Sequence, residues 1–326
     1  MLEIDFSLLL SSIIAGAAPV LFASLGETIT EKAGVLNLSI DGTILLGAMV
    51  AFAAAVETDC LLVGFAAAGV VGVLVSGVLS YFSLRLGQSQ VAIGFVLTLM
   101  CRDLAYFLGN PYCRIPGPQA IPVPIPILKE LPFLGVAVFS QTLPVYMSLV
   151  LIGFCWWYFY RTQWGLRMRA VGEAPDAAFA RGLAPQRLQT VYALAGGFLV
   201  GLAGATISLA VKPGWGRPQG AEGTGWIALA LVIFGGWHPI RVAAGAFLFS
   251  ALQVAGIFMQ GWFPSVPAQV LNVAPFPLMI FTLLLVNLLQ KESFQRWKET
   301  QPWAAAILEC LTGSPPEGLG KPYRSE

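Results

Sequence analysis

The sequence predicts an all-α polytopic membrane protein with eight to ten transmembrane helices. Of its 326 residues, 57% are hydrophobic and only 11% are charged, and the mean hydropathy is +0.76. Soluble domains carry about 25% charged residues, so a bilayer is the environment that accommodates this much apolar surface. The 35 glycines and 9 tryptophans agree with this class, because glycine is enriched in membrane helices and tryptophan collects at membrane interfaces.

Eight apolar runs are long enough to cross a bilayer, which takes about 20 helical residues. They cover residues 7–25, 36–56, 61–84, 88–109, 141–160, 188–211, 240–262 and 270–290. A further run, WIALALVIFGG at 226–236, is too short to span alone. We expect it to be a broken or re-entrant segment, which is tolerated where it is buried in protein or lines a cavity. Residues 1–290 are therefore the predicted transmembrane domain.

Basic residues predict the orientation, because cytoplasmic loops of membrane proteins are enriched in lysine and arginine. Arginines are concentrated in 161–187, and further basic residues follow the last apolar run. Both regions are predicted to be cytoplasmic, and the loops 110–135 and 212–225 external. The same count places the N-terminus outside, although an extra segment near 27–40 would reverse it. Residues 291–326 are a predicted cytoplasmic tail, and its end, TGSPPEGLGKPYRSE, is expected to be disordered.

Several kinds of chemistry lack the residues that they need. His238 is the one histidine in the sequence, which excludes a multi-histidine metal site, and we expect it in a turn. There is no GxxxxGK[ST] phosphate loop and no HExxH motif. The five cysteines have no CxxC spacing and are interpreted as small apolar residues. The net charge of +1 predicts no nucleic-acid partner. We therefore predict no catalytic residues and no metal site.

The stretch RTQWGLRMRAVGEAPDAAFARGLAPQRL, residues 161–188, is polar and helix-prone in an otherwise apolar chain. Pro175 suits the first turn of a helix, where Asp176 would interact favourably with the helix dipole. Gly182 can end that helix in the left-handed conformation. The pattern predicts a short helix on the cytoplasmic surface that fits a groove on a partner protein. An amphipathic helix resting on lipid is the alternative.

A second polar pattern occurs in LGETITEKAGVLNLSIDGTILLGAMVAF, residues 25–52. Asn37 and Asp41 stand within an apolar run, and such groups usually face a bundle interior or a water-filled path. Helix capping by either residue is the alternative, with Gly34 and Gly42 allowing the backbone to turn. Both interpretations hold together where broken helices build a transport site.

Three blocks of the sequence resemble a known family. RTQWGLRMRAVGEAPDAAFARGL is similar to the signature of permease subunits of bacterial ABC importers, in the branched-chain amino acid and simple sugar permease superfamily. ETITEKAGVLNLSIDGTILLGA resembles a second block of these permeases, and GTGWIALALVIFGGWHP resembles one typical of nucleoside-type permeases. The blocks follow one another in order over residues 25–240.

The resemblance implies a non-catalytic, multi-pass subunit of the bacterial inner membrane, surrounded by membrane lipid. It needs no cofactor of its own, because ATP and Mg are used by a partner ATP-binding cassette subunit. A second homologous permease, forming a heterodimer, and an extracytoplasmic substrate-binding lipoprotein are the other implied partners. The polar insert would be the coupling helix, with Ala174 in place of the asparagine that the family more often has. The residues predicted to couple to the ATPase are Arg167, Arg169, Val171, Gly172, Glu173, Ala174, Pro175, Asp176, Ala177 and Ala178.

The resemblance favours a nucleoside-like substrate over a simple sugar, a furanosyl signal or riboflavin. A nucleobase suits a path with aromatic rings on which to stack. The residues predicted to line the path are Asn37, Asp41, Phe95, Trp226 and Phe234. A stand-alone channel or ion-coupled transporter is a distant alternative, since it needs intramembrane charges, and Arg102 with Asp103 is the one adjacent pair near the end of a span.

Overall fold

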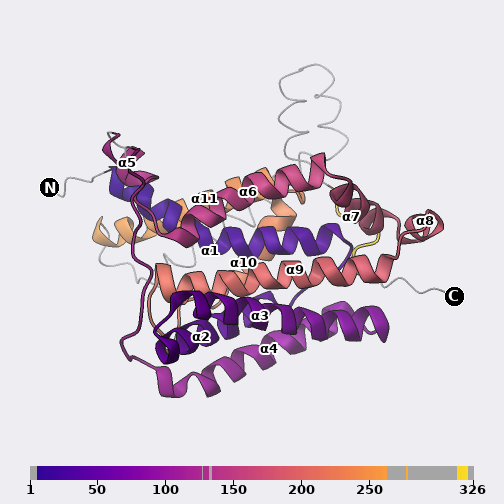
Figure 1. The fold of residues 1–326 in the computed structure, drawn as a ribbon, viewed down its shortest axis with the longest axis horizontal. Coiled ribbons are helices and arrows are strands. Elements are labelled where there is room, and N and C mark those ends of the chain that lie inside the picture. Colours follow the sequence, from indigo (N-terminus) through magenta and orange to yellow (C-terminus); the bar gives the residue numbers. More distant parts are fainter. Residues whose placement is uncertain (1–5, 127, 132–133, 263–276, 278–313, 322–326) are drawn as a thin grey trace.

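The computed structural model describes residues 6–126, 128–131, 134–262, 277 and 314–321. Seven helical segments in this part of the chain are long and apolar enough to cross a membrane (Figure 1). They are α1 (Phe6–Lys32), α2 (Ile40–Thr58), α3 (Leu61–Ser80) with its π-helical continuation η1 (Tyr81–Arg85), α4 (Gln90–Leu108), α6 (Leu143–Arg161), α9 (Pro185–Thr206) with the π-helical η4 (Ile207–Val211), and α11 (Pro239–Trp262).

The remaining elements are short. They are η2 (Asn110–Tyr112), η3 (Leu128–Glu130), α5 (Leu134–Ala137), α7 (Gln163–Glu173), α8 (Pro175–Ala180) and α10 (Thr224–Phe234). The described residues contain one isolated β-bridge, Pro122 with Thr142, and no strand. The prediction of an all-α polytopic protein is confirmed. The eighth predicted run, 270–290, lies outside the described residues apart from Pro277.

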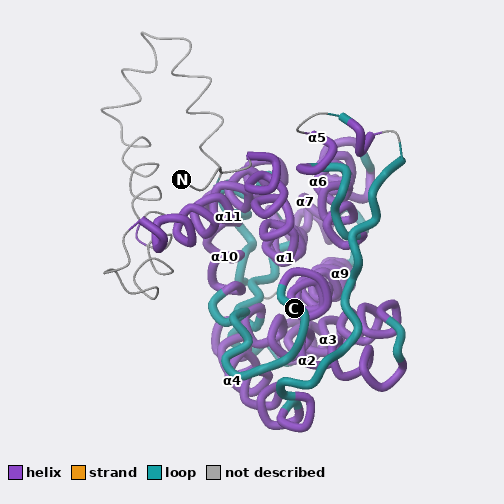
Figure 2. Tube along the Cα trace, turned by 90° about the vertical axis from the view of Figure 1, so that its left-hand side faces the viewer, coloured by secondary structure: helices purple, strands orange, loops and turns teal. Residues whose placement is uncertain are grey.

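Helix α9 lies between α1 on one side and α2 and α3 on the other, and it packs against all three (Figures 1 and 2). Glycines let the backbones come close. A Cβ atom on Gly72 of α3 would lie 1.9 Å from the carbonyl oxygen of Gly197, and one on Gly204 would lie 2.3 Å from that of Ile44. Helix association in lipid depends on such close packing, because burying apolar side chains away from lipid gains little.

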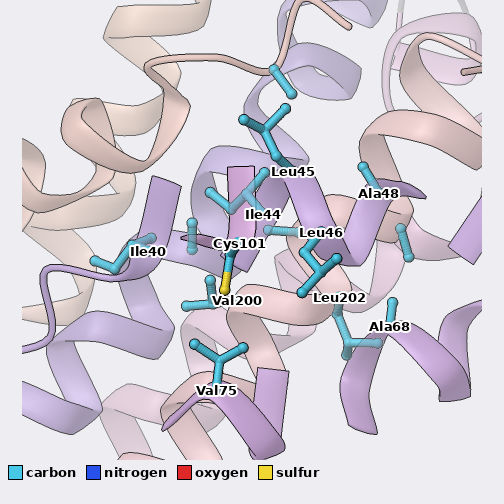
Figure 3. Close-up of a cluster of buried hydrophobic side chains, with 14 of the residues drawn as sticks. Ile40, Ile44, Leu45, Leu46, Ala48, Ala68, Val75, Cys101, Val200 and Leu202 are labelled. Carbon is cyan, nitrogen blue, oxygen red and sulfur yellow. The ribbon is translucent and has the colours of Figure 1, made fainter. Parts of the chain in front are cut away.

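The largest cluster of buried apolar side chains fills the space between these helices (Figure 3). Ile44 and Leu45 of α2 meet Val75 of α3 and Val200 of α9 there. Cys101 of α4 is 1% exposed in the same cluster and carries a free thiol, which agrees with its interpretation as a small apolar residue. The cluster joins α4 to the centre of the bundle.

Two helices begin inside the bundle instead of at one of its ends. After α1 the chain folds back along it, and the backbone N–H of Asn37 donates to Glu27 Oε1 at 3.1 Å. Glu27 lies about 8 Å along α1 from Lys32, the last residue of that helix. Because Asn37 binds Glu27 shortly before α2 begins, α2 starts inside the bundle and not at its end. Helix α10 meets this point from the other side, since the N–H of Gly225 donates to Asp41 Oδ1 at 3.0 Å. With 11 residues, α10 is only about 16 Å long, which confirms the predicted broken segment.

Enlarging Gly72 should destabilise the bundle, because a side chain there would collide with the backbone of α9. We expect Gly72→Val to lower the free energy of unfolding by about 1–3 kcal/mol, the usual cost of overpacking. Thermal unfolding of the detergent-solubilised chain would measure the change. Gly153→Ala is the matched control, since a Cβ on Gly153 has no atom within 4 Å. Equal stability of both variants would show that α3 and α9 do not pack closely.

Candidate functional site

The carboxylate of Asp41 lies where the N-terminal ends of α2 and α10 meet. It accepts hydrogen bonds from the backbone N–H groups of Gly225 and Gly223. A Cβ on Gly225 would stand 2.3 Å from Asp41 N, so only glycine permits this approach. Helix N-termini carry a partial positive charge, which a carboxylate compensates. Asp41 therefore caps a helix, as one interpretation of the sequence proposed, but that helix is α10 and not its own.

The turn before α2 is built by polar side chains. Asn37 Oδ1 accepts hydrogen bonds from the backbone N–H and the hydroxyl of Ser39, at 3.0 and 2.6 Å. Helix α4 holds the turn from the side, since Gln90 Oε1 accepts the N–H of Leu36 at 2.7 Å and the Thr98 hydroxyl donates to the carbonyl of Leu38 at 2.6 Å. Asn37 itself is 1% exposed, so it shapes this turn without forming part of the chain's surface.

An aromatic pair lies beside Asp41. Trp226 follows Gly225, and its ring centroid is 6.3 Å from that of Phe95 on α4. The two side chains are 38% and 50% exposed, so the pair forms part of the chain's surface. The structure thus brings together three of the five residues predicted for the path. Phe234 is separate, because it lies at the other end of α10, 3.7 Å from a Cβ placed on Gly245 of α11.

Charged and aromatic residues extend this surface along α4. Tyr106 is three helical turns from Phe95 and therefore on the same face. Its hydroxyl donates to Glu222, its ring centroid lies 5.8 Å from that of Trp215, and the guanidinium of Arg217 stands 4.8 Å above it. Arg102 lies on α4 between Phe95 and Tyr106. Both Arg102 and Glu222 interact electrostatically with Asp41. We call this strip of α4 and 215–226 the polar–aromatic lane.

Glu222 holds together the loop that leads into α10. Its carboxylate accepts the backbone N–H groups of Gln219 and Gly220 at 2.9 and 2.7 Å, in addition to the Tyr106 hydroxyl. Partial burial opposes ionisation, but these donors outweigh it and bring the pKa of Glu222 below its usual value. Glu222 is therefore ionised at neutral pH. Sequence reasoning missed Tyr106, Arg217 and Glu222, because they meet only through the fold.

The polar insert forms two helices. Thr162 begins α7, with its hydroxyl oxygen accepting the N–H of Gly165 at 3.0 Å. Pro175 opens α8, and Gly182 at φ +81° follows its end. The N–H of Leu183 returns to the carbonyl of Ala178 at 3.1 Å. The predicted short helix from Pro175 is confirmed, whereas α7 was not predicted. Ala174, which precedes α8, supplies no side-chain cap.

The residues predicted to couple to the ATPase divide into outward and inward groups. Val171, Gly172 and Ala178 are buried, and a Cβ on Gly172 would lie 2.1 Å from the carbonyl oxygen of Lys32. Gly172 therefore packs directly against the end of α1, and all three residues expose little surface. The guanidinium of half-buried Arg169 lies 5.1 Å from the ring centroid of Tyr160. Pro175 is also half-buried, and the outward group is Arg167, Glu173, Ala174, Asp176 and Ala177.

A segment of the C-terminal tail lies against this insert (Figure 1, yellow). The N–H of Gly318 donates to the carbonyl of Gly172 at 2.9 Å, and that of Gly320 donates to the carbonyl of Gly34 at 3.2 Å. The N–H of Glu317 donates to Glu173 Oε2 at 3.2 Å. Residues 317–320 thus form a turn, in contrast to the disorder expected for this part of the tail. They connect the α7–α8 corner to the loop after α1.

The contact of the tail should depend on the absence of a side chain at Gly318. A Cβ there would lie 2.6 Å from the Gly172 oxygen and 3.2 Å from Pro175 Cδ. We expect Gly318→Val to displace the segment and to speed hydrogen exchange of its amides by about fivefold or more, since each lost hydrogen bond is worth about 1 kcal/mol. Glu317→Ala is the control, because Glu317 makes its contact through the backbone. Unchanged exchange in Gly318→Val would contradict the contact.

Two buried glutamates, Glu27 and Glu31, lie in the part of α1 that is close to the polar insert. Glu31 is 1% exposed and accepts the indole N–H of Trp237, which lies in the turn between α10 and α11. The next residue, His238, stacks on Tyr160 with ring centroids 5.3 Å apart. Burial, Arg241 and Lys32 lower the pKa of His238, so it is neutral at pH 7. His238 occupies a turn, as expected, and Glu27, Glu31 and Trp237 were not recognised from the sequence as a group.

This architecture is that of a membrane-embedded transport subunit, with a surface helix at one end and a broken helix inside. Comparison with known proteins agrees. The family described as "Branched-chain amino acid transport system / permease component" matches residues 9–289, and the chain belongs to it. No solved structure gave a significant match.

Three relatives show the range of solutes in the family. A putative glucose ABC transporter permease protein of Haloferax volcanii is 36% identical over 77% of this chain and 78% of its own length. A nucleoside ABC transporter permease protein of Lactococcus lactis is 29% identical over 86% and 92%, respectively. A guanosine ABC transporter permease protein of Bacillus subtilis is 25% identical over 85% and 91%. The chain is thus a multi-pass ABC transporter permease subunit, and its relatives differ in solute.

Proposed function

We propose that this chain forms one side of the path by which an ATP-driven importer moves a nucleoside-like solute. The observation that carries the proposal is the half-exposed Phe95–Trp226 pair beside the carboxylate of Asp41. Aromatic rings stack on a nucleobase, and carboxylates accept hydrogen bonds from ribose hydroxyls. The polar–aromatic lane lies on the surface of this chain, so a closed path needs a second wall. A homologous permease subunit would supply that wall.

A simple sugar is the second candidate, because the glucose permease is a relative at 36% identity. Sugars also bind carboxylates through their hydroxyls, but they offer no aromatic ring to Phe95 and Trp226. The two solutes therefore differ in how strongly their uptake should depend on this pair. The nucleoside and guanosine permeases among the relatives favour the nucleoside.

ATP hydrolysis would come from a partner subunit that docks on the outward face of α8. Asp176 and Ala177 are exposed on this face, while Ala178 is 4% exposed and faces the chain itself. A small side chain at the outward position allows a partner groove to approach closely. A substrate-binding lipoprotein would deliver the solute at the opposite end of the bundle, near Tyr106 and Arg217.

Removing the indole of Trp226 should weaken nucleoside uptake. For the assembled importer at low substrate concentration we expect Trp226→Ala to reduce nucleoside uptake about threefold to tenfold, from an aromatic contribution of about 0.5–1.5 kcal/mol. Uptake of radiolabelled guanosine and glucose into proteoliposomes would measure it. Trp157→Ala, which removes a 51% exposed tryptophan of α6, should have no effect. If glucose and not guanosine were transported, the sugar would replace the nucleoside as substrate.

Bulk on the outward face of α8 should uncouple the ATPase. We expect Ala177→Trp to abolish co-purification of the ATPase or substrate-stimulated hydrolysis, because the indole blocks close approach. Arg181→Ala should be much milder, since an exposed charge pair contributes only about 0–1 kcal/mol. Ala178→Trp is not equivalent, because it would disturb the chain's own packing. Normal ATPase binding and transport by Ala177→Trp would favour the alternative that α8 rests on lipid.

A further inference from the structure

A groove opens between η1 and the start of α9, at the end of the bundle that holds α8. Its volume is about 910 Å³. The walls include Ser80, Tyr81, Leu84 and Arg85 from α3 and η1, and Arg187 and Thr190 from α9. None of the described residues that line the groove is acidic. The polar–aromatic lane and the outward face of α8 use none of these side chains.

Two arginines give the groove its charge. Arg85 and Arg187 are exposed, and neither forms an ion pair within the part of the chain that the structure describes. Arg187 belongs to the first turn of α9, where no side chain caps the helix. Helix N-termini carry a partial positive charge, which adds to that of the guanidinium groups. The groove therefore attracts an anion, and planar guanidinium groups suit the oxygens of a phosphate.

The hydroxyl of Ser80 is a further feature of the wall. Ser80 is 1% exposed, and its Oγ has no hydrogen-bond partner among the described residues. Buried polar groups are normally satisfied. A hydroxyl that lacks a partner within the chain can donate to a bound ligand or water.

The remaining walls of the groove are apolar. Leu84 is 3% exposed at its base, and Tyr81 and Val191 are 55% and 57% exposed on helices that span the membrane. A free phosphate would leave this surface uncovered, whereas the glycerol and acyl chains of a phospholipid would cover it. Basic pockets between transmembrane helices bind anionic lipid head groups in this way.

We propose that this groove binds the phosphate head group of an anionic phospholipid, from the leaflet on the α8 side. Arg85 and Arg187 would contact the phosphate, and an acyl chain would lie along Tyr81 and Val191. The same leaflet is the one that the arginine distribution predicts to be cytoplasmic. The lipid would then bridge η1 and the start of α9, which follows α8 directly in the chain.

Native mass spectrometry of the purified full chain, titrated with phosphatidylglycerol or phosphatidylcholine, tests the proposal. We expect the anionic lipid to bind more tightly. Arg85→Gln and Arg187→Gln should each weaken it about fivefold, and the double variant about thirtyfold, from the usual contribution of a basic residue near a lipid head group. Arg181→Gln, an exposed arginine at the same end outside the groove, is the matched control. Equal binding of both lipids, or equal binding by all variants, would overturn the proposal.

Two further measurements identify the source of the ligand. Inorganic phosphate that displaces phosphatidylglycerol at equal concentration would assign the groove to a soluble anion and overturn the lipid. Val191→Trp should fill the apolar part, so loss of phosphatidylglycerol binding with an unchanged unfolding temperature supports the acyl-chain contact. Loss of the lipid when a second permease subunit assembles would instead identify the groove as a protein interface.

Discussion

The carboxylate of Asp41 is the point on which the interior of this protein depends. Two helices begin at this place inside the bundle, and their free N–H groups have no water to bind if lipid surrounds the bundle. Asp41 satisfies the start of α10 from the first turn of α2. Without it, the broken segment would leave buried donors unpaired, at a cost of about 1–3 kcal/mol for each. One side chain thus makes a half-helix compatible with a membrane.

The same interaction positions the residues proposed to meet the solute. Trp226 follows the glycine that Asp41 binds, and α4 is fastened to the turn before α2 through Gln90 and Thr98. Phe95 and Trp226 are therefore held by two elements that share one anchor. These hydrogen bonds position the inner end of the lane, whereas its outer end depends on the loop organised by Glu222.

Contacts run without a break from the surface insert to this anchor. Gly172 touches the end of α1, Glu31 of α1 binds Trp237, and Glu27 of α1 binds the backbone of Asn37. Asn37 in turn shapes the turn that leads to Asp41. Each step is a hydrogen bond or a backbone contact. This continuity is what the proposed coupling to an ATPase requires.

The sequence by itself determined the fold class, because the number and length of apolar runs leave a bilayer as the only suitable solvent. It also determined the short helix at Pro175, where proline and glycine act through local backbone geometry. The broken segment at 226–236 followed from the length of its apolar run, which is too short to cross a bilayer. Asp41 was recognised as a polar group in an apolar run. Local patterns sufficed for these features because their causes lie within a few residues of chain.

Only the tertiary structure decided which of these residues meet. Asp41 caps α10 by binding Gly225, 184 residues further along the chain. Phe95 and Trp226 become neighbours because α4 and α10 both bind the segment that leads into α2. The division of the insert into buried Gly172 and Ala178 and exposed Ala177 depends on the end of α1 and on the tail residues around Gly318. Such contacts follow from the packing of whole helices, and hydrophobic periodicity carries no information about which helix lies beside which.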